Sequence, residues 1–179
     1  MDSSHKKKNI IELTNCTVAQ YKKLDKLPVA VMLDNVRSMY NVGSVFRTAD
    51  AFLIDSVVLT GITGCPPHPE ITKTALGAEE SVNWEYFENA EDAIFKAKEE
   101  SWKICVLEQA HGSIPLQDFK PSPEEKYMIV AGNEVSGVNQ RIVDIADIIL
   151  EIPQYGVKHS LNVSVSIGIA LWQFIRSQF

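Results

Sequence analysis

The sequence predicts an α/β domain with a mainly parallel sheet flanked by helices. Short, continuous apolar runs are typical of strands that are buried on both faces of a parallel sheet, and the clearest lie at residues 29–33 and 127–131. Between such runs, the segment 41–53 has apolar residues at i, i+3, i+4 and i+7, which is the spacing of a helix packed on a core. Strands that alternate with helices indicate parallel strands joined by crossover helices.

Length and composition fit this class. A chain of 179 residues is long enough for one domain with a sizeable core. A hydrophobic content of 45% and a charged content of 22% are typical of soluble globular proteins. Residues 148–175 form the longest apolar stretch, but charged residues interrupt it, so we expect no membrane span. Three widely spaced cysteines give no disulfide framework and favour a cytoplasmic protein.

The charge is distributed unevenly along the chain. The net charge is −6, but residues 1–50 hold eight Lys or Arg against five Asp or Glu, which leaves −9 on the remainder. A basic end on an acidic body can bind phosphates locally, although the total charge argues mildly against a nucleic-acid partner. The alternative is a solvated charged face with a disordered start.

The first element lies in an N-terminal extension, residues 1–27. We expect residues 1–8 to be disordered and residues 9–26 to form a short helix that Pro28 ends. The basic residues of the N-terminal stretch MDSSHKKKN are not followed by an apolar core, so we expect no secretory signal. Residues 28–179 are then expected to form the folded domain.

The second helix carries the first candidate functional group. We expect Asn41 to cap the helix at 41–53, with its apolar stripe facing the sheet. Gly43 and Arg47 lie one turn apart on another face, where a glycine leaves room for a bulky partner to approach the guanidinium. The simpler interpretation is that Asp50, three residues after Arg47, forms a surface ion pair with it.

The later elements follow the same alternation. Cys65 and His68 are potential metal ligands without further partners nearby, so we expect no metal site there. Cys105 lies within an expected strand and is interpreted as a small core residue. The remaining strands are expected at 56–60, 82–87, 102–107 and 148–152, and the remaining helices at 70–76, 90–100, 139–146 and from 161 almost to the C-terminus.

Three loops follow the predicted strands at their carboxyl ends, where parallel sheets collect their ligands. These loops are 108–113, 132–137 and 153–160. Ser160 is expected to cap the last helix, and the free amides of that first turn would attract a carboxylate or a phosphate. An ordinary strand–loop–helix connection is the alternative interpretation of this segment.

Common catalytic and phosphate-binding fingerprints are absent from the sequence. It contains no G-x-x-x-x-G-K-[ST], no G-x-G-x-x-G in the loop at 132–137 and no G-x-S-x-G. The adjacent His159 and Ser160 leave a hydrolase as an alternative, although no acidic partner is identified for them.

Three segments, taken in order, resemble the motifs of one family. Asn41-Val-Gly-Ser-Val-Phe-Arg47-Thr-Ala resembles N-x-G-[AS]-x-x-R-[TS]-x, and Val130-Ala-Gly-Asn-Glu134-Val-Ser-Gly137-Val resembles a strand ending in G-x-E-x-x-G. Ile152-Pro followed by Ser160-Leu-Asn162-Val-Ser-Val resembles the third motif. The chain is therefore similar, over about residues 28–175, to the SpoU (TrmH-like) RNA ribose 2′-O-methyltransferases of the SPOUT superfamily.

The resemblance implies an activity as well as a fold. It implies a deep trefoil knot in the C-terminal part, one of the rare exceptions to unknotted topology. It implies methyl transfer from S-adenosyl-L-methionine to a ribose 2′-hydroxyl, with S-adenosyl-L-homocysteine as the product and without a metal. It also implies a homodimer with the RNA site across its interface. A compact tRNA modifier is favoured; the alternatives are an rRNA 2′-O-methyltransferase and a non-catalytic RNA-binding dimer.

The resemblance also assigns site residues. Arg47 is placed at the hydroxyl, where its very high pKa favours phosphate clamping and oxyanion stabilisation over action as a base. Asn41 would orient Arg47 or the RNA backbone, while Glu134, Ser160 and Asn162 would complete the catalytic pocket. The cofactor-binding positions are Leu107, Glu108, Gln109, Gly132, Ile152 and Leu161.

Overall fold

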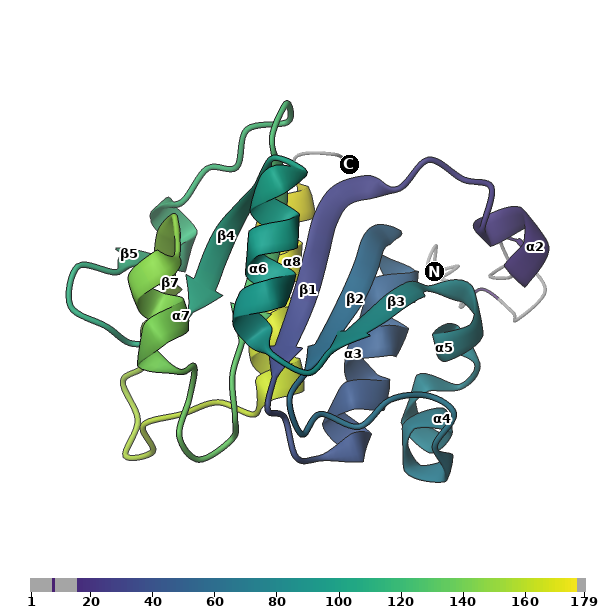
Figure 1. Cartoon of the computed structure of the whole chain (residues 1–179), viewed down its shortest axis with the longest axis horizontal. Helices are drawn as coiled ribbons and strands as arrows, with labels where there is room; N and C mark the ends of the chain where they lie inside the picture. Colours follow the sequence, from purple (N-terminus) through teal and green to yellow (C-terminus); the bar gives the residue numbers. More distant parts are fainter. Residues whose placement is uncertain (1–7, 9–15, 177–179) are drawn as a thin grey trace, which may run out of the picture.

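The computed structural model describes residue 8 and residues 16–176. Within these residues, seven strands form one sheet in the order β3-β2-β1-β6-β4-β7-β5, and every neighbouring pair is parallel (Figure 1). This confirms the predicted α/β class, and it adds the two-residue β5, which the sequence did not predict. The strands are β1 (Leu27–Asp34), β2 (Ile54–Thr60), β3 (Asn83–Phe87), β4 (Trp102–Leu107), β5 (Ile114–Pro115), β6 (Lys126–Ala131) and β7 (Ile148–Glu151).

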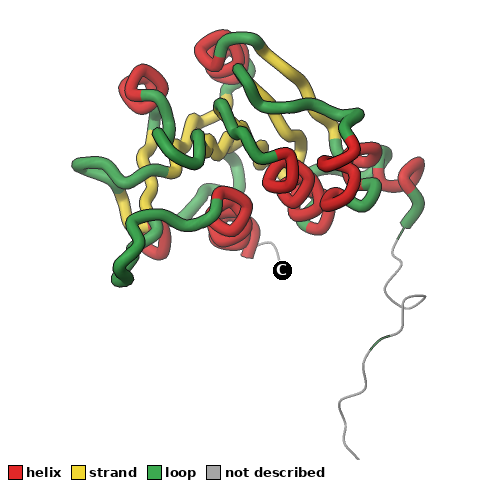
Figure 2. The backbone as a smooth tube through the Cα atoms, turned by 90° about the horizontal axis from the view of Figure 1, so that it is seen from below, coloured by secondary structure: helices red, strands yellow, loops and turns green. Residues whose placement is uncertain are grey.

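Helices cover both faces of the sheet, as Figure 2 shows from below. The face with α3, α4, α5 and α8 has one apolar core, and the face with α6 and α7 has another. A 3₁₀ turn, η1 (Leu116–Asp118), follows β5 and contacts α8. The helices are α2 (Val18–Tyr21), α3 (Met39–Ala51), α4 (Pro69–Ala75), α5 (Ala78–Ser81), α6 (Ala90–Glu99), α7 (Gln140–Ile145) and α8 (Val163–Ile175).

The continuous apolar runs are explained by this two-sided packing. On β1, Val31 and Leu33 belong to the core under α3 and α8, while Ala30 and Met32 belong to the core under α6. All four side chains are fully buried. A strand that is covered on both faces has no position for a solvated side chain, so it reads as an unbroken apolar run. No helix among residue 8 and residues 16–176 combines the length and apolarity needed to cross a bilayer.

The N-terminal helix differs from the expectation. Residues 1–7 and 9–15 lie outside the described residues, so their predicted disorder and helix are not covered by the structure. Among the described residues 16–26 of that segment, only the single turn α2 is helical, and Thr17 and Gln20 form a capping box at its start. Strand β1 begins at Leu27, so Pro28 is the second residue of a strand and does not end a helix. A proline is tolerated there because the first strand residues need not donate to the ladder.

Two predicted helix caps are wrong. The cap of α3 is Ser38 and not Asn41, because the Ser38 hydroxyl accepts a hydrogen bond from the Asn41 amide at 3.3 Å. The cap of α8 is Asn162 and not Ser160, because Asn162 Oδ1 accepts from the Ser164 amide at 3.0 Å. Serine and asparagine cap helices about equally well, so residue type alone did not identify the capping position.

The path of the chain between β7 and α8 brings distant segments together. After β7, the chain runs past the loop that follows β6 and enters α8, which contacts β1, β6 and α3 (Figure 1). This path is compatible with the trefoil knot that the resemblance implies, and the knot stays a prediction. Because β4 pairs in parallel with both β6 and β7, the loops that follow these three strands all lie at the same carboxyl edge of the sheet.

Candidate functional site

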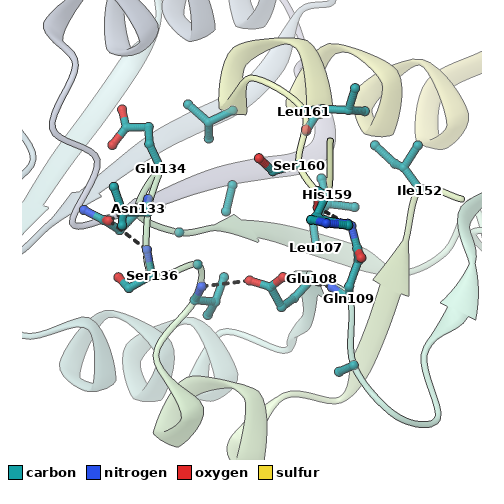
Figure 3. Close-up of a pocket in the computed structure, with 18 of the residues that line it drawn as sticks. Leu107, Glu108, Gln109, Asn133, Glu134, Ser136, Ile152, His159, Ser160 and Leu161 are labelled. Atoms are coloured by element: carbon teal, nitrogen blue, oxygen red, sulfur yellow. Dashed lines mark hydrogen bonds between the residues drawn. The ribbon is translucent and has the colours of Figure 1, made fainter. Parts of the chain in front are cut away.

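A cavity of about 510 Å³ opens between the loops that follow β4, β6 and β7 (Figure 3). Leu107, at the end of β4, lines the cavity together with Ile152 and Leu161, which follow β7. Glycine and polar residues of the loop after β6 also line it. Glu134 and Ser160, two of the five residues predicted to be catalytic, also line it. All six residues predicted to bind a cofactor line this cavity: Leu107, Glu108, Gln109, Gly132, Ile152 and Leu161.

Glu108 fastens the loop after β4 to the loop after β6. Its Oε2 accepts a hydrogen bond from the Val138 amide at 3.0 Å, and its Oε1 accepts from the Gln109 amide at 2.9 Å. Gly137 has a φ of 69°, and a Cβ at that position would lie 2.2 Å from Glu108 Oε2. The carboxylate therefore shapes the cavity wall, and glycine is required where the two loops meet.

Gln109 fastens the same loop to the loop after β7. Its Nε2 donates to the carbonyl oxygen of His159 at 2.9 Å (Figure 3). No carboxylate among residue 8 and residues 16–176 pairs with the His159 ring, which disfavours the hydrolase alternative. Ser160 is exposed in the same loop and faces the cavity.

The loop after β6 is closed by its own backbone. Asn133 and Gly137 exchange two backbone hydrogen bonds of 3.1 and 2.9 Å. Asn133 Oδ1 also accepts from two amides of the loop, while its Nδ2 donates to the carbonyl of Asn35 at 2.8 Å. A Cβ on Gly132 would lie 2.3 Å from the Gly137 backbone. Asn133 was missed from the sequence, although an asparagine between turn glycines is the signal of such a side-chain turn.

Three separate segments are joined by one hydrogen-bonded chain. The Glu134 carboxylate accepts from the amides of Arg37 and Ser38, at 3.0 and 3.1 Å, and from Asn41 Nδ2 at 3.0 Å. Asn41 Oδ1 in turn accepts from Asn162 Nδ2 at 3.0 Å. The start of α3, the loop after β6 and the start of α8 are thereby held in register.

The environment of Glu134 keeps it ionised. Its partial burial acts to raise the pKa, but the hydrogen bonds from the Arg37 and Ser38 amides and from Asn41 outweigh that effect. The pKa of Glu134 therefore lies below the ordinary value of a glutamate. At neutral pH this carboxylate is an acceptor that positions α3, and it has no proton to donate.

Arg47 lies apart from the three-loop cavity. Its side chain is exposed on α3 and lines a second cavity, of about 790 Å³, between α2, α3 and the α4–α5 turn. The ion pair with Asp50, the simpler interpretation of Arg47, does not form in the described structure; Asp50 Oδ1 accepts a hydrogen bond from Ser81 Oγ instead. Of the eleven predicted site residues, Arg47 is the one that the fold of a single chain does not bring to the others.

The space predicted beside Gly43 is filled. A Cβ on Gly43 would lie 2.1 Å from Thr74 Oγ1 and 2.3 Å from the Ile71 carbonyl oxygen. Gly43 therefore lets α4 pack closely on α3, and the prediction that it leaves room beside Arg47 is wrong. Gly43 does allow a close approach, but the group that approaches it is α4 of the same chain.

No metal centre is formed in the part of the chain that the structure describes. His68 caps α4, because its Nδ1 accepts a hydrogen bond from the Glu70 amide at 3.2 Å. Cys105 is fully buried in the core, as predicted, and burial raises the pKa of its thiol. Neither residue has the surroundings of a ligand or a nucleophile.

Comparison with known sequences gives consistent matches. The model of the SpoU rRNA Methylase family matches residues 28–172. An uncharacterized tRNA/rRNA methyltransferase of Mycoplasma genitalium is 32% identical over 155 residues, which cover 87% of this chain and 62% of that protein. One from Borreliella burgdorferi is 30% identical over 148 residues, which cover 82% of this chain and 63% of that protein. The chain thus spans less than two thirds of these relatives.

Comparison with solved structures gives the same family of folds. An AdoMet-bound rRNA methyltransferase from Sinorhizobium meliloti superposes with a TM-score of 0.79 and 25% identity, over 89% of this chain and 60% of that one. A TrmH/SpoU tRNA modifying enzyme from A. aeolicus superposes with a TM-score of 0.79 and 26% identity, over 90% of this chain and 80% of that one.

Proposed function

Because the chain belongs to the SpoU rRNA Methylase family, we propose that it transfers a methyl group from S-adenosyl-L-methionine to a ribose 2′-hydroxyl of RNA, with tRNA favoured over rRNA. The observation that carries this proposal is the chain of hydrogen bonds from Asn162 through Asn41 to Glu134 beside the three-loop cavity. These three residues come from the three motifs of the resemblance. A packing role alone gives no reason for polar side chains from distant motifs to meet at a cavity edge.

The cavity suits the cofactor in size and chemistry. Its volume of about 510 Å³ falls within the range of small-molecule sites. Leu107, Ile152 and Leu161 offer apolar surface to an adenine ring, and Gly132 lines the same cavity with main-chain atoms alone. When bound, the cofactor supplies a methyl group that its positively charged sulfur has already activated.

Arg47 provides the charge that the RNA substrate requires. A guanidinium is permanently protonated, so Arg47 binds a phosphate next to the target ribose and stabilises the developing oxyanion. Asn41 and Glu134 hold the start of α3, and therefore the helix that carries Arg47, in a fixed position. Accurate alignment of the hydroxyl with the methyl group supplies much of the acceleration.

Arg47 does not line the cofactor cavity of its own chain. The proposed chemistry therefore requires a homodimer in which Arg47 of one chain meets the cofactor cavity of the other. The exposed face of α8 supports this assembly. Val165, Ile169 and Trp172 are 50%, 41% and 53% exposed and form an apolar stripe, and the Trp172 ring lies 6.2 Å from that of Phe52 beside α3. Such a stripe is typical of a surface that packs against a partner. We also propose a cytoplasmic location, where RNA and the cofactor are both present.

The activity is tested by incubating the protein with S-adenosyl-L-methionine labelled on its methyl group and with unmodified tRNA or rRNA transcripts. Alkali cannot cleave the bond that follows a 2′-O-methyl ribose, so the proposal expects label in an alkali-resistant dinucleotide. Label in a mononucleotide would indicate base methylation and would contradict the ribose assignment. RNA binding without transfer would favour the non-catalytic dimer.

A further inference from the structure

The chain that leaves β1 is anchored by buried hydrogen bonds. Asp34, Thr60 and Thr63 are buried, with at most 3% of each residue exposed. Asp34 Oδ1 accepts a hydrogen bond from Thr60 Oγ1 at 3.0 Å. Thr63 Oγ1 donates to the Leu33 carbonyl oxygen at 3.1 Å and accepts from the Val36 amide at 2.9 Å. Buried polar groups that are paired in this way hold the end of β1 in one position.

Asn35, which follows Asp34, uses all four of its polar groups to join three loops. Its side chain donates to Asp34 Oδ1 at 2.8 Å and accepts from the Ile62 amide at 3.2 Å. Its amide donates to the Thr60 carbonyl oxygen at 3.2 Å, and its carbonyl oxygen accepts from Asn133 Nδ2 at 2.8 Å. Asn35 therefore connects the ends of β1 and β2 to the loop after β6.

The backbone of Asn35 lies outside any helix or strand. Its φ is 55°, in the left-handed region that asparagine tolerates better than most residues. Such a conformation persists only where the surroundings fix it. The loop after β2 is fitted closely to it, because a Cβ on Gly61 would lie 2.2 Å from Asn35 Oδ1. The direction of the Asn35 carbonyl group is therefore set by the contacts of its own side chain.

Two consecutive residues of the loop after β6 hold this segment at separate points. Asn133 Nδ2 donates to the carbonyl oxygen of Asn35. The Glu134 carboxylate accepts from the amides of Arg37 and Ser38. One contact alone would let the loop rotate about it, whereas two separate contacts fix its orientation.

We propose that Asn35 is a positioning residue for the S-adenosyl-L-methionine cavity, and that it acts through Asn133. Asn35 lies outside the residues that line this cavity, whereas Asn133 lines it. Asn133 Oδ1 also accepts from the amides of Val135 and Ser136, which line the cavity too (Figure 3). Without the contact to Asn35, this closed turn can rotate about the contacts of Glu134 and change the cavity wall. The inference rests on the proposed cofactor cavity.

Cofactor affinity gives the first test, in the full chain and without RNA. Asn133→Ser removes the donor to Asn35, while a serine hydroxyl can still accept from the loop amides in the same kind of turn. The dissociation constant of S-adenosyl-L-methionine, measured by calorimetry, should rise about fivefold, as for the loss of one hydrogen bond. An unchanged dissociation constant in Asn133→Ser would overturn the inference.

Tyr127→Phe is the matched control for that measurement. The Tyr127 hydroxyl donates to Glu125 Oε2 at 2.6 Å, at the amino end of β6 and therefore at the edge of the sheet opposite the cavity. Loss of this hydrogen bond should lower the melting temperature and leave the dissociation constant of the cofactor within about twofold.

A double-mutant cycle gives the second test. Asn35→Gly tolerates the positive φ but loses both side-chain hydrogen bonds that fix the carbonyl group, so the dissociation constant should rise about threefold. In the Asn133→Ser protein the carbonyl group has no donor to hold, so the same change should alter the dissociation constant by less than about 1.5-fold. A merely structural role would lower the melting temperature in both backgrounds without this dependence. Effects that multiply in the double variant would overturn the inference.

The outcome can be separated from that of the proposed function. Wild-type cofactor affinity in Asn133→Ser, together with methyl transfer to RNA, would overturn the positioning role and leave the activity standing. The expected rise in the dissociation constant, in a protein that transfers no methyl group to any RNA, would support the positioning role and contradict the activity.

Discussion

Asn41 and Glu134 lie 93 residues apart in the sequence, and the side-chain amide of Asn41 donates a hydrogen bond to Glu134 Oε1 at 3.0 Å. The contact joins the start of α3 to the loop after β6. Because the same carboxylate accepts from the Arg37 and Ser38 amides, Glu134 organises the turn that begins α3.

The first prediction concerns the pH dependence of stability. The folded-state pKa of Glu134 is lowered, so its contribution is fully present above the unfolded-state value of about 4.3 and is lost as the pH falls through the folded-state value. Glu134→Gln should therefore flatten the decline in stability below about pH 4.5. At neutral pH it should cost about 1 kcal/mol, since Glu134 is exposed and solvent screens it. Denaturant unfolding at several pH values measures both effects.

Glu99→Gln is the control for that experiment, because Glu99 is an exposed residue near the end of α6, away from the site. The control should retain the wild-type slope of stability against pH. If Glu134→Gln had the same slope as the control, the carboxylate would not be a coupled acceptor in the folded protein.

The second prediction concerns the loop after β6. Gly132→Ala would place a Cβ 2.3 Å from the backbone of Gly137, and the loop would have to open. We expect a loss of about 1–3 kcal/mol in stability, as for other overpacked sites, and strongly weakened binding of S-adenosyl-L-methionine by calorimetry. Gly156→Ala is the control, since its Cβ would meet no atom within 4 Å. Normal cofactor affinity in Gly132→Ala would remove this loop from the binding site.

The third prediction separates the two roles of Asn162. Asn162→Asp keeps an oxygen to accept from the Ser164 amide, and its negative charge suits a helix N-terminus, so stability should change by less than about 0.5 kcal/mol. It removes the donor to Asn41 Oδ1, so methyl transfer should fall about tenfold or more. Asn162→Ala should lose both the cap and the activity. Full activity in Asn162→Asp would show that the contact with Asn41 is dispensable.

The fourth prediction concerns assembly. Ile169→Glu introduces a charge into the exposed apolar stripe of α8 and should convert a dimer into monomers in light scattering. Because Arg47 of one chain would then lose the cavity of another, methyl transfer should disappear as well. Phe95→Glu, on the opposite face of the sheet at an exposed position, should leave the dimer intact. A dimer that survives Ile169→Glu would place the interface elsewhere.

Much of the fold could be predicted from the sequence because burial on two faces leaves an unmistakable pattern. The strand at 127–131 is apolar throughout, and the structure buries it between two cores. The two-residue β5 could not be found, because it is too short to show any period. The caps at Ser38 and Asn162 were displaced by two or three residues, since several good capping residues stand close together.

The site was predicted unevenly for a different reason. Residues that follow strands, such as Gly132 and Leu107, are brought to one edge by the parallel topology alone. The hydrogen bond between Glu108 and the Val138 amide depends on how two loops meet, which local pattern does not encode. Gly43 shows the same limit, because its close neighbour comes from α4.

The fifth prediction tests the role of Arg47, on which the proposed chemistry depends. The measurement compares wild type and Arg47→Ala for cofactor affinity and for single-turnover methyl transfer to the same RNA. Because Arg47 is assigned to an RNA phosphate and to the developing oxyanion, and not to the cofactor, the affinity for S-adenosyl-L-methionine should stay within about twofold. Transfer should fall by about 10³-fold, as when a charge-stabilising group is removed. Comparable transfer rates in the two proteins would contradict the account.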